Sequence, residues 1–164
     1  MSEYILDLRK VVGHRPLLQL GASVIVEDAD GRILLQRRRD NGLWGYSGGS
    51  VELYESVEDA AARELLEETG LRALSMSLFG LYSGAGMAYV YPNGDRVSNV
   101  DAVFLCREFT GRLCPQLSEV LELQWFSRES LPPEQMLTPP NRPALEKWRQ
   151  GKRDCLDTGW RKKE

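Results

Sequence analysis

The chain has 164 residues, of which 42% are apolar and 27% charged, a balance typical of one ordinary globular domain. Its net charge of −3 argues against the basic surface of a general nucleic-acid-binding protein, so no nucleic-acid polymer is expected as a partner. No run of about 18 apolar residues occurs, and the opening MSEYILDLRK lacks the long apolar core of a signal peptide, so no membrane partner is expected.

The numbers and positions of cysteine and histidine residues exclude further kinds of site. Cys106, Cys114 and Cys155 are an odd number of cysteines without metal-site spacing, and they are interpreted as free thiols of a protein in the reducing cytoplasm. The single histidine, His14, argues against a Ser-His-Asp site or a histidine-rich zinc site. An acidic protein of this kind needs a cation to bind an anionic substrate.

The first half of the chain contains a clear helix signal. Residues 22–38 predict a β-hairpin, because β-branched residues lead into an Asp-Ala-Asp-Gly turn and a second apolar run follows. Residues 39–50 are expected to form a glycine-rich loop. A helix is predicted from Ser56 to Thr69, with Ser56 as N-cap, acidic residues in the first turn and Gly70 as its end.

The second half of the chain indicates more strands and a terminal helix. Strands are predicted at 73–84, at 120–126 and, as two strands about a Pro-Asn-Gly-Asp turn, within 87–109; a short proline-broken helix at 127–135; a terminal helix at 142–150; and a charged tail at 160–164. This order predicts an α/β fold with a mixed sheet and helices on its faces. One domain is expected over residues 1–164, with a core at about 20–150 and an extension at each end.

The segment RELLEETG, residues 63–70, concentrates negative charge on one side of the predicted helix. Glu64, Glu67 and Glu68 project within an arc of about 100° on helical geometry. Like charges at such spacings repel each other by about 0.2–0.5 kcal/mol per pair. The cluster is therefore either a solvated acidic face or a site for a divalent cation such as Mg²⁺ or Mn²⁺, which prefer oxygen ligands.

The wider spacing around this segment resembles the Nudix box of the Nudix hydrolases, or MutT-like proteins. Gly49 is followed after five residues by Glu55, and Glu55 after seven by the rest of the pattern. That rest is Arg63, Glu64, Leu65, Glu67, Glu68, Gly70 and Leu71. A chance match over this length is on the order of one in a million on average composition.

The resemblance implies a fold, a reaction and a set of roles. The implied fold is the Nudix-type α/β/α sandwich with a mixed β-sheet. The implied reaction is metal-dependent hydrolysis of a nucleoside diphosphate linked to another moiety, with Mg²⁺ or Mn²⁺ as cofactor. The implied metal ligands are Glu64, Glu67, Glu68 and the backbone carbonyl of Gly48, and the implied structural ion pair joins Arg63 to Glu55.

Some parts of the resemblance leave alternatives open. Glu67 is taken as the general base, with Glu119 and Glu122 as candidates outside the box, although either is more simply a solvated carboxylate. Two positions depart from the usual family pattern: Ser47 stands where many members have proline, and Tyr54 where many have glycine. Neither departure removes a ligand, but both bear on substrate details.

The substrate contacts are predicted from arginines and aromatic residues. Strand alternation aims at least one of Arg37, Arg38 and Arg39 at the site, and Arg37 is taken as the phosphate contact. Trp44 either stacks on a nucleobase or anchors its loop. Tyr82, Tyr89 and Tyr91 flank residues 83–99, a segment that could cover the substrate or make a dimer contact, whereas Trp125 is expected in the core.

Two other functions on the same fold are weighed against hydrolysis. A catalytically inactive Nudix-fold nucleotide-binding or regulatory module usually loses box glutamates, and this chain keeps them all. An isomerase of isoprenyl diphosphates needs a cysteine and a histidine near the site, and no cysteine lies close to the box in the sequence. Family members are often homodimers, so a homodimer is kept open.

Overall fold

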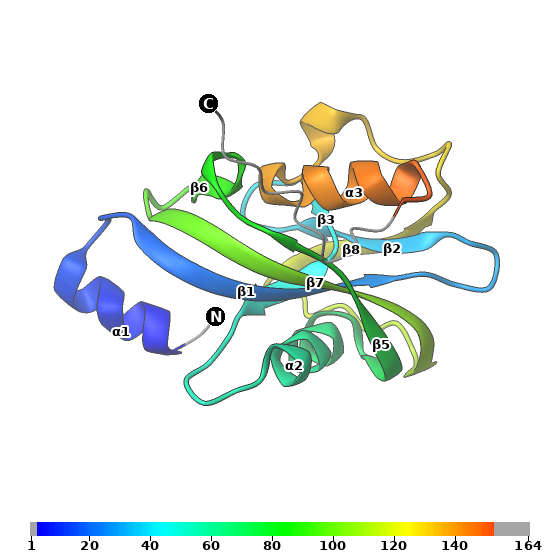
Figure 1. Ribbon diagram of the computed structural model, residues 1–164, viewed down its shortest axis with the longest axis horizontal. Coiled ribbons are helices and arrows are strands. Elements are labelled where there is room, and N and C mark those ends of the chain that lie inside the picture. Colours follow the sequence, from blue (N-terminus) through cyan, green and yellow to red (C-terminus); the bar gives the residue numbers. More distant parts are fainter. Residues whose placement is uncertain (1–2, 153–164) are drawn as a thin grey trace, which may run out of the picture.

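The computed structural model describes residues 3–152 (Figure 1). The α-helices of this part are α1 (Glu3–Val12), α2 (Val57–Thr69) and α3 (Arg142–Arg149). Its strands are β1 (Leu17–Val26), β2 (Ile33–Arg38), β3 (Trp44–Gly45), β4 (Ser47–Ser50), β5 (Leu71–Tyr82), β6 (Ala88–Val90), β7 (Arg96–Gly111) and β8 (Val120–Phe126). Short 3-10 helices are η1 (Ala85–Met87), η2 (Glu134–Met136) and η3 (Pro139–Asn141).

The strands form two sheets. The larger has the order β4-β1-β7-β5, with β6 paired to β7, and the smaller has the order β3-β2-β8. Strands β1 and β7 run parallel in the middle of the larger sheet, and the other strand pairs are antiparallel, so the larger sheet is mixed. Both central strands carry continuous apolar runs, as expected of strands that are covered on both faces.

Helices α2 and α3 lie on opposite sides of the strands (Figure 1). Successive side chains of a strand point to opposite faces, so Val24 packs in the cluster with Leu65 of α2, whereas Ile25 packs in the cluster with Leu145 and Trp148 of α3. The result is an arrangement of helix, strands and helix. The predicted α/β/α sandwich with a mixed sheet is confirmed.

The predicted hairpin over residues 22–38 is correct only at its turn. Asp28 donates its backbone N–H to the carbonyl of Arg32 at 2.9 Å, and one bridge joins Glu27 to Ile33. Beyond that bridge the strands part, because β1 pairs with β4 and β7 in the larger sheet while β2 pairs with β3 and β8 in the smaller one. Local sequence marks the turn but does not specify these distant partners.

Other segments refine or correct the sequence-based expectations. The glycine-rich segment 39–50 contains β3 and β4, so it is only partly a loop. The proline-broken helix expected at 127–135 is wrong: the segment forms turns before η2, because consecutive prolines lack N–H donors and disfavour helical neighbours. The strands predicted after residue 72 correspond to β5, β6, β7 and β8, and the helices predicted at 56–69 and 142–150 correspond to α2 and α3. Helix α1 was not anticipated, and residues 160–164 lie outside the described part.

Candidate active site

Helix α2 is fixed at both ends by its capping residues. The hydroxyl of Ser56 accepts a hydrogen bond of 3.1 Å from the backbone N–H of Asp59. Gly70 ends the helix with a positive φ of 77°, a conformation that costs glycine little. The apolar stripe of Ala61 and Leu65 packs under the larger sheet, and this packing sets the direction of each glutamate on the helix.

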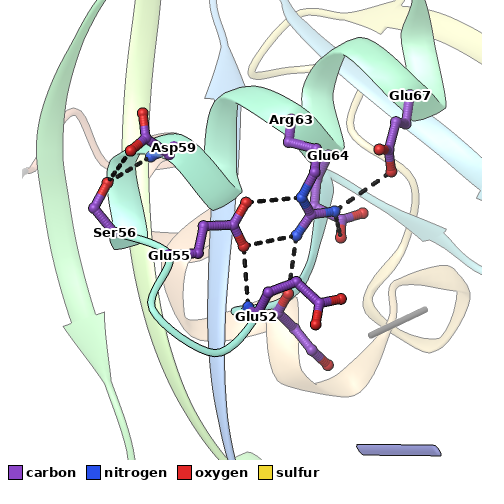
Figure 2. Close-up of polar contacts among 8 residues, drawn as sticks. Glu52, Glu55, Ser56, Asp59, Arg63, Glu64 and Glu67 are labelled. Carbon is purple, nitrogen blue, oxygen red and sulfur yellow. Dashed lines mark hydrogen bonds and ion pairs between the residues drawn. The ribbon is translucent and has the colours of Figure 1, made fainter. Parts of the chain in front are cut away.

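Arg63 joins α2 to the loop that precedes it (Figure 2). Its guanidinium donates to both oxygens of Glu55, at 2.8 and 3.0 Å, and to the carbonyl of Ser50 at 3.2 Å. Glu55 also accepts from the backbone N–H of Glu52 at 3.0 Å. The hydrogen bonds from Arg63 lower the pKa of Glu55. This bidentate geometry ties β4, the loop and the helix together.

Arg63 also lies between two glutamates of the cluster (Figure 2). Its Nη1 is 2.6 Å from Oε1 of Glu64 and 3.4 Å from Oε2 of Glu67. The side chain of Glu64 is 9% exposed, whereas that of Glu67 is 49% exposed. Within residues 3–152, no three His, Cys, Asp or Glu side chains are gathered closely enough to hold a metal ion.

Glu64 and Glu68 turn inward and line one cavity together with Gly48 and Gly49. Glu68 is buried and accepts a hydrogen bond of 3.0 Å from the backbone N–H of Gly48. Burial raises the pKa of Glu68 to about 8 and also raises the pKa of Glu64. A Cβ at position 49 would overlap the carboxylate of Glu64, and one at position 48 would lie 2.8 Å from the Cα of Ser23.

This donor set fits a hard divalent cation. Glu64 and Glu68 are buried carboxylates that face the same space, and their raised pKa values reflect the cost of placing negative charge there without a compensating cation. The missing side chain of Gly49 leaves room for the carboxylate of Glu64, and that of Gly48 leaves room for Ser23 of β1. Oxygen donors of this kind suit Mg²⁺ or Mn²⁺. Glu67, by contrast, lies half-exposed outside the cavity lining.

The three arginines at the end of β2 are placed differently from the expectation. Arg38 lines the cavity and is held by Asp40 through hydrogen bonds of 3.0 and 2.9 Å. Arg37 does not line it and donates to the carbonyl of Gly42 at 3.2 Å. The strand register shifts between Arg37 and Arg38, so simple alternation could not identify the inward arginine. Arg39 donates to a backbone carbonyl at 2.7 Å.

Trp44 is an anchor of its segment and not an open stacking surface. Its side chain is buried and packs edge-on against Phe126, with ring centroids 5.0 Å apart. Its backbone carbonyl accepts from the N–H of Thr138 at 2.8 Å. The alternative of base stacking by Trp44 therefore has no exposed ring face to support it.

Of the tyrosines predicted at the segment 83–99, one lines the candidate active site. Tyr89 and Tyr91 pack edge-on at 5.0 Å, and Tyr91 lines the carboxylate cavity. Tyr82 is buried. Trp125, expected in the core, is only partly buried: it packs against the edge of the core cluster and stacks on Phe109 with a centroid separation of 6.0 Å.

The two glutamates considered as general bases outside the box, Glu119 and Glu122, lie in different places relative to the cavity. Glu119 lines the carboxylate cavity, whereas Glu122 pairs in register with Arg37 on the smaller sheet and does not line it. His14 lies 2.8 Å from Asp95 through its Nδ1 and forms an ion pair when protonated. Of these three residues, Glu119 lines the candidate active site, and Glu122 and His14 do not.

Helix α1 supplies a wall of the cavity that the sequence did not suggest. Ile5, Leu6 and Arg9 line it. Arg9 holds the helix in place, because its Nη2 donates to the carbonyl of Arg96 at 2.6 Å and its Nε lies 3.5 Å from Asp95. The apolar pair of this helix faces the same space as the carboxylates, so the cavity has an apolar side as well as a charged one.

Asp101 is a further buried acid that sequence reasoning missed. It lies on β7, and both of its oxygens accept from the hydroxyl of Ser23 on β1, at 2.9 and 3.0 Å. Burial raises the pKa of Asp101 to about 6, although the hydrogen bonds from Ser23 act in the opposite direction. An acidic residue inside the apolar run NVDAVFLC was the available signal.

Comparison with known proteins settles the family. The sequence profile described as "NUDIX domain" matches residues 17–148, well over half of the chain. The chain belongs to the Nudix family. The resemblance drawn from the Nudix box is thereby confirmed.

Individual Nudix relatives agree with this assignment. The ADP-ribose pyrophosphatase of Methanocaldococcus jannaschii is 31% identical over 134 residues, which cover 76% of this chain and 75% of that protein. The crystal structure of a MutT Nudix hydrolase from Burkholderia pseudomallei superposes with a TM-score of 0.65 at 31% identity, covering 80% of this chain and 97% of the other.

Other Nudix relatives are longer than the region of similarity. The NAD-capped RNA hydrolase NudC of Vibrio cholerae is 35% identical over 96 residues, 58% of this chain and 32% of that protein. The chain thus spans about a third of that relative and less than half of two further curated relatives.

Proposed function

We propose that this Nudix chain is a metal-dependent pyrophosphohydrolase that cleaves a nucleoside diphosphate linked to another moiety. The observation that carries the proposal is the pair of buried carboxylates, Glu64 and Glu68, facing one cavity that Gly48 and Gly49 also line. A pyrophosphate is itself strongly anionic, and such a pair accepts it only with a cation between them.

The residues that would hold Mg²⁺ or Mn²⁺ are Glu64 and Glu68 with the backbone carbonyl of Gly48. Glu67 lies outside the cavity lining and would join them by turning its side chain from Arg63 toward the cavity. When bound, the cation neutralises charge and polarises phosphoryl oxygens. Arg63 keeps the loop and helix together through Glu55, so its role is to position the glutamates.

The other charged residues of the cavity have roles in orientation and proton transfer. Arg38 replaces Arg37 as the proposed phosphate contact, since Arg38 lines the cavity and Arg37 does not. Glu67 is kept as the proposed general base, and its exposure lets it exchange a proton with water. Glu119, which also lines the cavity, is the second candidate for that role.

The names of the relatives support the reaction class without fixing the substrate. One relative is named for ADP-ribose and another for NAD-capped RNA. ADP-ribose contains a nucleoside diphosphate linked to another group, and so does an NAD cap. Because the chain spans about a third of the NAD-capped RNA hydrolase, a small-molecule substrate stays our proposal and a capped polymer is an outcome of the test.

A cytoplasmic location completes the proposal. Cys106 is buried and Cys114 exposed, and both are free thiols, which fits a reducing compartment. Cys155 lies outside the described residues. Among the helices of residues 3–152, none has the length and apolar character needed to cross a membrane.

The test is a screen of the purified protein against nucleoside triphosphates, nucleoside diphosphate sugars, dinucleotides and a capped RNA, with Mg²⁺, with Mn²⁺ and with EDTA. We expect metal-dependent release of a nucleoside monophosphate, with pyrophosphate or a phosphorylated partner as second product. Metal-independent release, or no release from any substrate while the nucleotides still bind, would overturn the proposal in favour of a binding module.

A further inference from the structure

A second recess opens beside the carboxylate cavity and shares part of its wall. Gly48, Gly49 and Arg38 line both, so a single ligand can extend from one into the other. The second recess lies over the β1–β7 pair, where Ser23 and Asp101 form its floor. We call it the Asp101 recess. Its other walls include Tyr46, Met87, Tyr89, Tyr91, Thr138 and Asn141.

The floor of the recess is a buried carboxylate without a cationic partner. Asp101 is 6% exposed, and within the described residues it forms no ion pair; its hydrogen-bond partner is Ser23. Gly21 is paired with Asp101 in register, and a Cβ there would lie 3.1 Å from its Oδ1. Glycine at this position therefore leaves the carboxylate accessible from the recess.

The walls of the recess carry further buried polar groups. Within residues 3–152, the buried hydroxyl of Thr138 has no hydrogen-bond partner, and the buried hydroxyl of Tyr46 interacts with the amide of Asn141. The amide of Asn141 lies against Gly45, where any side chain at position 45 would displace it. Buried polar groups are costly to leave unpaired, so such a set indicates a ligand that hydrogen-bonds to them. The adjacent rings of Tyr89 and Tyr91 suit a flat aromatic ligand.

The carboxylate of Asp101 at the floor of the recess determines which nucleobase can bind there. A carboxylate only accepts hydrogen bonds, and its two oxygens match two neighbouring donors. Guanine presents such a pair on one edge, N1–H and the 2-amino group. Adenine and cytosine instead place a donor beside a ring-nitrogen acceptor, and uracil places one N–H between two carbonyls. An acceptor opposite a carboxylate is repelled.

We propose that Asp101, positioned by Ser23, is a specificity-determining residue that accepts the two donors of a guanine base bound in the Asp101 recess. This inference rests on the proposed function, because it assumes that the phosphates occupy the neighbouring carboxylate cavity. It narrows the substrate class to guanine nucleoside diphosphate derivatives.

The test is equilibrium binding of nucleoside 5′-monophosphates by calorimetry in Mg²⁺. These ligands have no anhydride bond, so binding is measured independently of hydrolysis. We expect GMP to bind at least about tenfold more tightly than IMP, which lacks the 2-amino group, and more tightly than AMP, CMP or UMP. Asp101→Asn should remove this preference by weakening GMP selectively, while the exposed carboxylate control Asp30→Asn should leave it unchanged.

Several results would overturn the inference. One is wild-type protein that binds GMP, IMP and AMP equally, a measurement that needs no variant and so holds even if Asp101→Asn fails to fold. Another is an Asp101→Asn protein that weakens every nucleotide alike. A third is an Asp101→Asn protein that loses affinity for GMP but not for dGMP. That result would mean that the carboxylate of Asp101 binds the 2′-hydroxyl of the ribose and not the base. Hydrolysis without guanine preference would refute this inference alone, whereas guanine preference without hydrolysis would refute the proposed function alone.

Discussion

The carboxylate of Glu64 lies in the space that a side chain on residue 49 would fill. This contact explains why the glycine of the Nudix box stands fifteen positions before a glutamate on the helix: backbone and carboxylate meet across the cavity. The backbone of Gly49 has no positive φ, so the requirement concerns space and not conformation.

Gly49→Ala should therefore displace the carboxylate and impair turnover more than stability. We expect kcat/KM to fall roughly tenfold to a hundredfold, the scale expected when a reacting group is misplaced by about 1 Å. The control is Gly86→Ala, because a Cβ there meets nothing within 4 Å. Steady-state kinetics of both variants against one substrate provide the comparison, and equal losses in the two would contradict the account.

Arg63→Ala should lower stability as well as activity. It removes the bidentate contact with Glu55 and leaves Glu64 without its cationic neighbour. The loss should be about 1–3 kcal/mol, which corresponds to a fall in Tm of roughly 3–10 °C for a chain of this size. Arg149→Ala, which breaks an exposed pair with Glu146, should change Tm much less. An unchanged Tm in Arg63→Ala would refute the structural role of the pair.

The sequence predicted best what depends on neighbouring residues. The caps of α2 and the shared side of its glutamates follow from spacings of a few residues, and the structure has these caps. The ion pair of Arg63 with Glu55, which the resemblance to the Nudix box implied, is also present. Trp44 could not be assigned from its segment, because its burial depends on Phe126, far along the chain. The inward arginine was missed because a register shift on β2 breaks the alternation.

The Asp101 recess could not be predicted from the sequence either, because it also depends on residues far apart in the chain. Ser23 and Asp101 are 78 residues apart and meet only because β1 and β7 pair in parallel. Nothing in either local segment specifies that register. Helix α1 was missed for a different reason: its residues were considered only as an export signal, although Glu3–Val12 carries a helical pattern of apolar residues.

Tyr54 offers a test of a departure from the family pattern. It is the described non-glycine residue with positive φ, at 69°, and its side chain is fully exposed. A left-handed conformation costs a non-glycine residue about 1–2 kcal/mol. Tyr54→Gly should therefore raise the free energy of unfolding by about 0.5–1 kcal/mol, after allowing for the entropy of glycine in the unfolded chain. Leu53→Gly, at a neighbouring position without positive φ, should lower it; urea denaturation of both variants would show the opposite signs, and a loss in both would refute the strain.

Asp101 should make stability fall as pH rises. Its pKa is raised by burial from 3.8 to about 6 in the folded state, so between these values the folded protein binds more protons than the unfolded chain. Stability from this group is thus highest in acid and is lost through about pH 4–6, by on the order of 2–3 kcal/mol. Other carboxylates titrate in the same range, so the measured quantity is the difference between wild type and Asp101→Asn in urea unfolding. A difference that stays constant with pH would contradict the burial of an ionisable group.

The most direct test of the central claim is the Mg²⁺ dependence of turnover in wild type, Glu67→Gln and Glu68→Gln, measured on the best substrate of the screen. We expect both variants to lose most of their turnover while keeping a folded structure, since Glu67 is half-exposed and a glutamine side chain at position 68 can still accept the hydrogen bond from the backbone N–H of Gly48. Glu68→Gln should in addition need more Mg²⁺ for half-maximal rate, because its carboxylate faces the cavity. Near-full turnover with an unchanged Mg²⁺ requirement in both variants would contradict the proposal that these glutamates form the metal site.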